Sequence, residues 1–264
     1  MTTCPNCQAE AVTSFCPQCG QRLGVKRITL RDTIRDSWTQ VVGFDGFFLR
    51  TIRDLTLRPG QVARSYINGI RVRYFGPVAY FFFMITLLLL WLSLLGLDFA
   101  ELIRSKQETL SLPNNNARGM ELITQWIGDN IKWVLFLAVP FQATAARAFL
   151  FRKSGFNFVE HMVPLFYVSG HLFWITMMVF TYQKFTGTIP VIFVSVISMG
   201  YFGYMYSSLM QYQSRVKAFV KGIGVYLGGQ MLFAVTLTIV AVIALIVVTL
   251  INPDLLDNIR PGIK

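Results

Sequence analysis

The alternation of hydrophobic and polar positions changes character near residue 75, where a polar, basic front part gives way to an apolar remainder. Residues 75–97 carry no charge, and at helical rise this run is long enough to cross about 30 Å of hydrocarbon. Four further apolar segments cover residues 131–150, 162–182, 189–212 and 223–251. The pattern predicts an all-α integral membrane bundle of about five transmembrane helices over residues 75–252, followed by a short outer tail, residues 253–264.

These segments differ in quality, and the second is the weakest. Its uncharged part covers only residues 133–146, and Pro140 is expected to kink it, so a re-entrant segment is an alternative to a full crossing. In the third segment, Pro164 is expected in the first turn, where proline is tolerated. Residues 213–222 are expected to form a basic loop before the last segment.

The distribution of lysine and arginine tests this topology independently. Seventeen of them lie in the front part and in the segments 147–160 and 213–222, against six on the other predicted side. Basic residues accumulate on the cytoplasmic side of membrane proteins, so the N-terminus is predicted to be cytoplasmic and the C-terminus outside. The same count indicates that residues 131–150 cross, because otherwise the later basic segments would be translocated.

Composition supports a membrane protein over a soluble one. The chain of 264 residues is 54% hydrophobic and 14% charged, against about 25% charged in typical soluble domains. The net charge of +11 follows the predicted topology, so we discount nucleic acid as a partner. The first apolar run begins only near residue 75, so we expect no signal peptide and expect the first span to direct insertion.

The front part itself divides into two expected domains. Residues 1–24 form a zinc ribbon, and residues 25–74 form cytoplasmic amphipathic helices. Three stretches, 28–42, 47–57 and 61–70, place apolar and basic positions on opposite faces of a helix. Such helices suit the membrane interface, where arginines meet anionic head groups. The alternative is that their apolar faces pack against the cytoplasmic ends of the spans, and we favour this for the apolar faces.

The cysteines carry the strongest chemical signal in the chain. Cys4, Cys7, Cys16 and Cys19 form two C-x2-C pairs eight residues apart, and the second pair is followed by Gly20. Two such pairs let four thiolates close tetrahedrally on one structural Zn²⁺, leaving no open position for catalysis. Iron bound by the same sulfurs is the chief alternative. A pair of disulfides is less favoured, because the front part is predicted to lie in a reducing compartment.

A second group of polar residues is predicted to share the cytoplasmic edge of the bundle, and we call it the polar rim. It consists of Arg71, Arg73, Arg147, Arg152, Glu160 and His161. Such a rim could bind a lipid phosphate or a phosphorylated substrate, or hold Glu160 in an ion pair. The interpretation that we favour is that the arginines serve only to set the topology. Glu160 is expected to cap a helix N-terminus. His171 is expected to be a buried bundle residue.

Several of these pieces, taken together, resemble an uncharacterised bacterial family with a zinc-ribbon head on a polytopic membrane domain. The residues that carry the resemblance are the runs 15–21, 57–60, 66–74 and 157–161. The family has a basic residue where this chain has Ile70. The resemblance covers most of the chain and implies an architecture and a bacterial inner-membrane location. It implies no activity, because the family is described only as a domain of unknown function.

These observations lead to three functional hypotheses. The preferred one is a non-enzymatic membrane protein whose zinc ribbon docks a cytosolic partner or stabilises the head, while the bundle binds lipid, another membrane protein or a second copy. The first alternative is a transporter or lipid-handling protein that uses the polar rim. The second is a membrane enzyme acting on a lipid or phosphorylated carrier, with His161 as acid or base. The sequence contains none of the common nucleotide-binding or hydrolase motifs.

Overall fold

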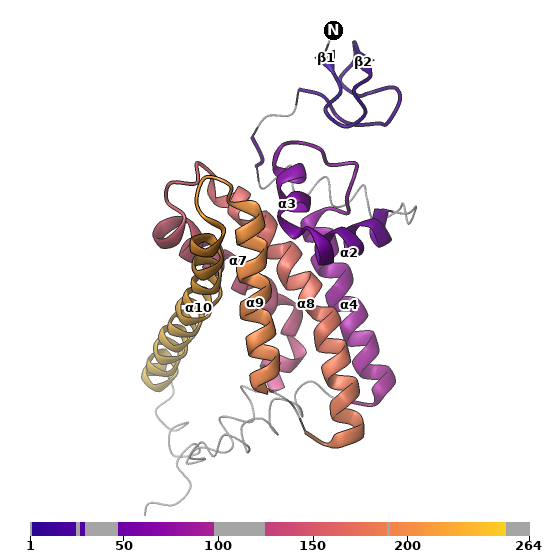
Figure 1. Cartoon of the computed structure of the whole chain (residues 1–264). Helices are drawn as coiled ribbons and strands as arrows, with labels where there is room; N and C mark the ends of the chain where they lie inside the picture. The colour runs from indigo at the N-terminus through magenta and orange to yellow at the C-terminus, as the bar shows by residue number, and fades with distance from the viewer. Residues whose placement is uncertain (1, 25–26, 30–46, 98–124, 189–190, 252–264) are drawn as a thin grey trace, which may run out of the picture.

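The membrane domain is a bundle of long helices, and the small N-terminal module projects from one end of it (Figure 1). The computed structural model describes residues 2–24, 27–29, 47–97, 125–188 and 191–251. Among these residues, five helices are long and apolar enough to cross a membrane: Pro77–Leu95, Ile131–Leu150, Phe158–Thr186, Ile192–Leu209 and Arg215–Val240. The expected all-α bundle with five candidate spans is therefore confirmed.

The first span, α4 (Pro77–Leu95), has sequence signals at both ends. Pro77 occupies the first turn, where its missing N–H costs no hydrogen bond, and Gly96 ends the helix in the left-handed conformation with φ 64°. Between them almost every residue is apolar, so sequence periodicity does not distinguish the buried face from the outer one. Packing decides it: α4 lies along α8, and Gly170 of α8 leaves room for Tyr80 of α4.

The second span is a continuous helix whose last turn is wider than an α-helix. α7 (Ile131–Thr144) contains Pro140 and continues without a break into the π-helix η1 (Ala145–Leu150). The N–H of Phe151 donates to the carbonyl of Ala146 at 2.7 Å. These two residues are five positions apart, which is the hydrogen-bond spacing of a π-helix. The continuous helix over residues 131–150 is long and apolar enough to cross a membrane, which makes it one of the five candidate spans.

Two boundaries in the later spans differ from those expected. α8 (Phe158–Thr186) begins four residues before the predicted third segment, so Pro164 lies inside the helix and its predicted first-turn position is wrong. α9 covers Val191–Leu209, and residues 189 and 190 before it lie outside the described part of the chain. α10 (Arg215–Ile251) includes most of the predicted loop 213–222. The loop prediction fails because lysine and arginine are good helix formers and mark a membrane edge without ending a helix.

The two helices before the spans are part of the bundle core. α2 (Phe47–Leu57) has the predicted bounds, and α3 (Pro59–Ile67) begins at the predicted Pro-Gly break. Their side chains Leu55, Val62 and Tyr66 are fully buried. The prediction that the apolar faces pack against the spans is thus confirmed for these two helices.

α3 is held tightly against α9. The Gly60 N–H donates to the Ser208 hydroxyl at 2.9 Å, and a Cβ at Gly60 would collide with Ser208 and with the backbone of Leu209. The hydroxyls of Tyr201 and Tyr204 in α9 donate to the last carbonyls of α2 at 3.0 and 2.5 Å. These bonds satisfy carbonyl groups that the end of a helix leaves without partners.

Some predictions fall on residues that the structure does not describe. They are the helix expected over 28–42, apart from its first two positions, and the outer tail 253–264.

Candidate metal centre

The four cysteine sulfurs gather at one point in the N-terminal module, and all lie within 4.8 Å of one another. The Sγ atoms of Cys4 and Cys19 are 3.6 Å apart, and those of Cys7 and Cys16 are 3.5 Å apart. Zn–S bonds of about 2.3 Å in a tetrahedron place sulfurs about 3.8 Å apart, whereas a disulfide needs about 2.05 Å. The donor set and its spacing fit one tetrahedral metal ion, and all four cysteines are free thiols.

Two matching backbone turns present these sulfurs. Gln8 N–H donates to Cys4 carbonyl and Gly20 N–H to Cys16 carbonyl, each at 2.9 Å. The residue after each C-x2-C pair has a positive φ, 63° at Gln8 and 68° at Gly20. Glycine adopts this conformation freely and glutamine does not, so the second turn follows the expected rule while the first carries some strain. A two-stranded sheet, β1 (Thr2–Thr3) with β2 (Glu10–Ala11), closes the module.

Gln21 connects the N-terminal module to the bundle. Its side chain is 1% exposed and enters the loop between α3 and α4. There Nε2 donates to the Gly69 carbonyl at 2.7 Å, and Oε1 accepts the N–H of Arg71 at 3.1 Å. The backbone carbonyl of Gln21 also accepts the N–H of Cys16 at 2.8 Å. One residue therefore bonds both a turn that carries a cysteine pair and the loop that precedes the first candidate span.

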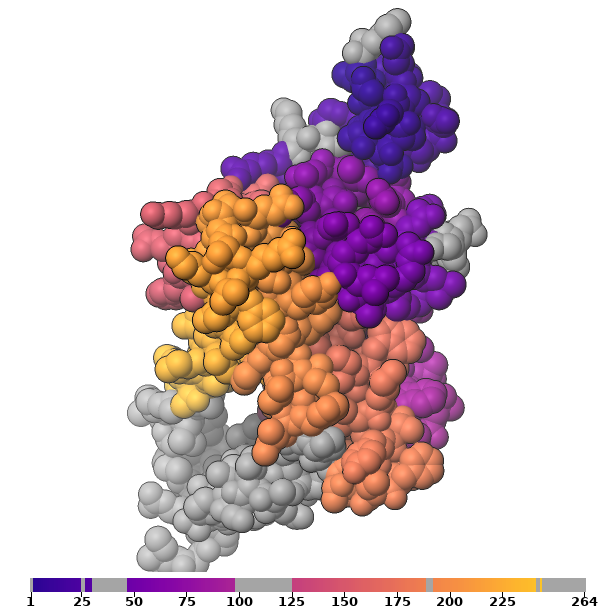
Figure 2. Space-filling model, viewed as in Figure 1, coloured from indigo at the N-terminus to yellow at the C-terminus, as the bar shows by residue number. Residues whose placement is uncertain are grey.

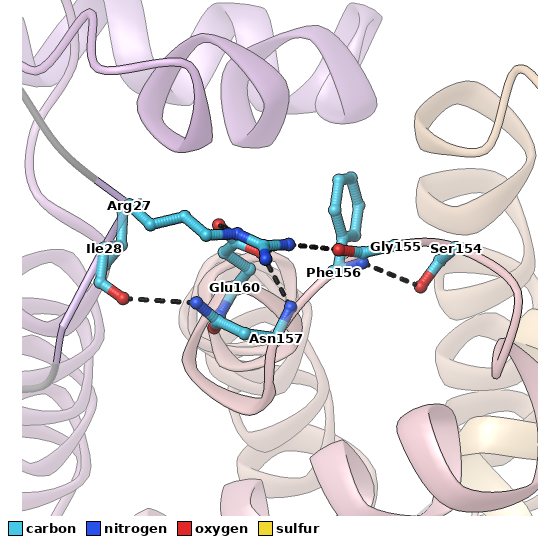
Figure 3. A network of polar contacts seen from close by, with 7 residues as sticks. All are labelled: Arg27, Ile28, Ser154, Gly155, Phe156, Asn157 and Glu160. Carbon is cyan, nitrogen blue, oxygen red and sulfur yellow. Dashed lines mark hydrogen bonds and ion pairs between the residues drawn. The ribbon is translucent and has the colours of Figure 1, made fainter.

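Arg27 makes a second connection, to the N-terminus of α8 (Figure 3). Its Nε and Nη2 donate to the two carboxylate oxygens of Glu160 at 3.1 and 3.2 Å, and Nη2 also donates to the Gly155 carbonyl. The Asn157 side chain donates to the Ile28 carbonyl at 3.3 Å. We call the contacts of Gln21 and Arg27 the clasp, because both fix the segment after the cysteines to the bundle.

Glu160 is already engaged by its own helix. Its Oε2 accepts the N–H of Asn157 at 2.6 Å, while its N–H donates to the Asn157 side chain at 2.7 Å. This reciprocal pair is a capping box, and the predicted capping role of Glu160 is confirmed. The ion-pair partner is Arg27, and the polar rim does not supply it.

The rim arginines lie on two other elements, the α3–α4 loop and the η1 end. Arg71 is 7% exposed and lies over the Tyr66 ring, and Arg73 lies over the Tyr74 ring, each at 5.6 Å. Arg147, in η1, and Arg152, just after it, are exposed. Of these elements, η1 contacts α8, and the charge of Arg147 acts on His161, so these two parts of the rim are neighbours.

The two histidines have separate partners. His161 is fully buried, and its Nε2 lies 3.1 Å from the Ser154 hydroxyl. His171 lies between Tyr80 and Thr56, with nitrogen–oxygen distances of 3.1 and 3.2 Å, and stacks on Tyr201. His171 therefore links α2, α4, α8 and α9, which confirms the expected buried bundle residue.

Asp54 is a buried carboxylate that the sequence patterns did not single out. It is 1% exposed, accepts the Tyr74 hydroxyl at 2.9 Å, and pairs with Arg53 at 3.0 Å and Arg58 at 3.6 Å. Burial raises the pKa of Asp54, but the hydrogen bonds from Tyr74 and Arg53 and the charge of Arg58 outweigh it and lower the pKa below its ordinary value. Asp54 thus fastens α2 to the residues that precede the first span.

The clasp residues left little trace in the sequence. Gln21 and Arg27 lie in a polar segment with no periodicity, and their partners are 48 and 133 positions away. For Asp54 the sequence offered one signal, since it is an acidic residue in an amphipathic stretch otherwise rich in arginine.

The comparisons with known proteins extend the picture only slightly. Residues 45–89 match the model of a family described as "Protein of unknown function (DUF3667)". This match includes α2, α3 and most of α4, and with them Asp54 and Tyr74. No curated protein and no solved structure matches the chain.

Proposed function

We propose that this chain is a non-enzymatic integral membrane protein in which a structural Zn²⁺ stabilises the cytoplasmic head and the bundle binds membrane lipid. The proposal depends chiefly on Gln21, whose buried side chain bonds the α3–α4 loop while its backbone completes a cysteine turn. A ribbon held in this way has a structural role in its own protein. Of the two roles predicted for the ribbon, we therefore favour head stabilisation over docking of a cytosolic partner.

Zinc is the metal we assign, because four thiolates in tetrahedral reach are a common structural zinc site. Such a site uses all four positions on protein ligands, so the metal has none left for water or substrate. Its binding free energy then contributes to the folding of a segment too short to have its own core.

For location, we propose the bacterial inner membrane, with the N-terminus in the cytoplasm and the C-terminus outside. The excess of lysine and arginine in the front part and in the segments 147–160 and 213–222 supports this orientation. The metal module, which projects beyond α2 and α3 (Figure 2), then lies in a reducing compartment that keeps thiolates available for zinc.

Two variants test the role of the metal. In the Cys16→Ser variant we expect bound zinc to be lost and the melting temperature in detergent to fall, because the clasp loses its support. In the Gln21→Ala variant we expect zinc to be retained and the melting temperature still to fall. Wild-type protein purified without transition metal, or a Cys16→Ser variant with unchanged melting temperature, would contradict the proposal.

A further inference from the structure

The surface of the bundle carries an apolar groove between η1 and α10. Its volume is about 320 Å³, near the lower end of the roughly 300 to 1,000 Å³ typical of small-ligand sites. Every side of it is apolar or glycine: Ala145, Phe149, Leu150, Gly224, Gly228, Met231, Leu232 and Val235. Both helices belong to candidate membrane spans, so the groove faces the hydrocarbon.

The glycines of α10 explain why a groove forms here. A Cβ at Gly224 would lie 3.2 Å from the side chain of Leu150, and one at Gly228 would lie 3.5 Å from Ala145. Without side chains on this face, η1 comes close to α10 and leaves a depression along it. The larger residues at the open side, Phe149 and Met231, remain 68% and 71% exposed.

One end of the groove is basic. Lys221 lies one turn before Gly224 on the same face of α10, with its ammonium 5.5 Å from the ring of Phe151, the residue that follows η1. Lys217, one turn further, is exposed, as are Arg152 and Lys153 beside Phe151. An apolar groove at membrane depth with a cationic end matches the shape and charge of an anionic phospholipid.

We infer that this groove binds one acyl chain of an anionic phospholipid, with Lys217 and Lys221 attracting the phosphate. The inference rests on the proposed function and makes it specific, since it assigns the bound lipid class and the surface that holds it.

Two pairs of variants test the inference on full-length protein. Val235→Phe places a ring in the groove, whereas Ala234→Phe places the same ring on an exposed position turned away from it. The double variant Lys217→Gln with Lys221→Gln removes the basic end of the groove. Lys184→Gln is the charge control, because Lys184 lies in the last turn of α8 and does not line the groove. Each protein is reconstituted with phosphatidylcholine and phosphatidylglycerol, exchanged into detergent and examined by native mass spectrometry.

We expect Val235→Phe to lose the retained phospholipid and Ala234→Phe to keep it. The double lysine variant should lose the preference for phosphatidylglycerol by about tenfold, with Lys184→Gln unchanged. Equal retention by the two phenylalanine variants overturns the inference. The inference is also overturned if wild-type protein is a dimer and Val235→Phe becomes a monomer while retaining the same amount of phospholipid, because the groove then binds a second copy of the chain. If wild-type protein retains no phospholipid, lipid binding by the bundle fails as well.

Discussion

At the scale of single residues, a few buried polar side chains make the connections between distant parts of the chain. Gln21 joins the cysteine turns to the α3–α4 loop, and Asp54 joins α2 to Tyr74. Buried polar groups cost stability when a partner is removed, because the remaining group has left water without compensation. The two sites therefore give separate predictions, one on metal-independent stability and one on pH.

Gln21→Ala leaves the Arg71 N–H and the Gly69 carbonyl without their side-chain partner. We expect a loss of about 1 to 3 kcal/mol in unfolding free energy, with bound zinc unchanged. Chemical denaturation in detergent, paired with elemental analysis, checks this. Gln18→Ala, in the exposed loop of the second cysteine pair, is the control and should have little effect. Loss of zinc in Gln21→Ala would show that the residue acts on the metal site itself.

Asp54 predicts a pH dependence. Its folded-state pKa is below the ordinary value of 3.8, so its charged form stabilises the fold above that pH. This contribution disappears as the pH falls below about 4 and through the folded-state pKa. We expect Asp54→Asn to melt below wild type at neutral pH and the difference to narrow in acid. A difference that is constant between pH 7 and pH 3 would contradict this assignment.

At the scale of elements, the helices that precede the spans behave as core. α3 meets α9 at Gly60, where no Cβ fits, and α2 ends on hydroxyls of α9. The hydrophobic pattern predicted α2 and the five spans, because uninterrupted apolar length and proline or glycine breaks are local signals. It misplaced the starts of α8 and α10, because charged residues continue a helix as readily as apolar ones.

Gly60→Ala tests the α3–α9 contact. The added methyl group meets the backbone of Leu209, which cannot move without shifting α9, so we expect destabilisation of about 1 to 3 kcal/mol. Gly200→Ala is the matched control within α9, since nothing lies within 4 Å of its Cβ position. There the change should be neutral or stabilise by up to about 1 kcal/mol. Thermal unfolding of both variants in one detergent makes the comparison.

At the scale of the whole molecule, the chain combines an N-terminal module with a four-cysteine cluster, a buried pair of helices and a bundle with five candidate spans. The cysteine spacing and the apolar lengths were enough to predict the parts. They did not predict how the parts join, because Arg27 and Glu160 are 133 positions apart and neither carries a local signal for the other. The polar rim was expected from topology alone, whereas the structure pairs its Glu160 with Arg27, which topology did not indicate.

The orientation proposed for the whole molecule has its own test. Reporter fusions at the two ends should show a cytoplasmic N-terminus and an external C-terminus, because an odd number of crossings separates the ends. If both ends lie on one side of the membrane, one candidate span does not cross. Residues 131–150 would be the first to test, because they form the weakest apolar segment.

The central claim is that the metal holds the clasp closed, and hydrogen exchange measures this most directly. Amide exchange is compared in zinc-loaded wild type and in protein treated with a chelator, over residues 69–72 and 155–160. We predict that zinc removal increases exchange in both segments and leaves the interior of α9 unchanged. Unchanged exchange at residues 69–72 and 155–160 after complete loss of the metal would contradict the account.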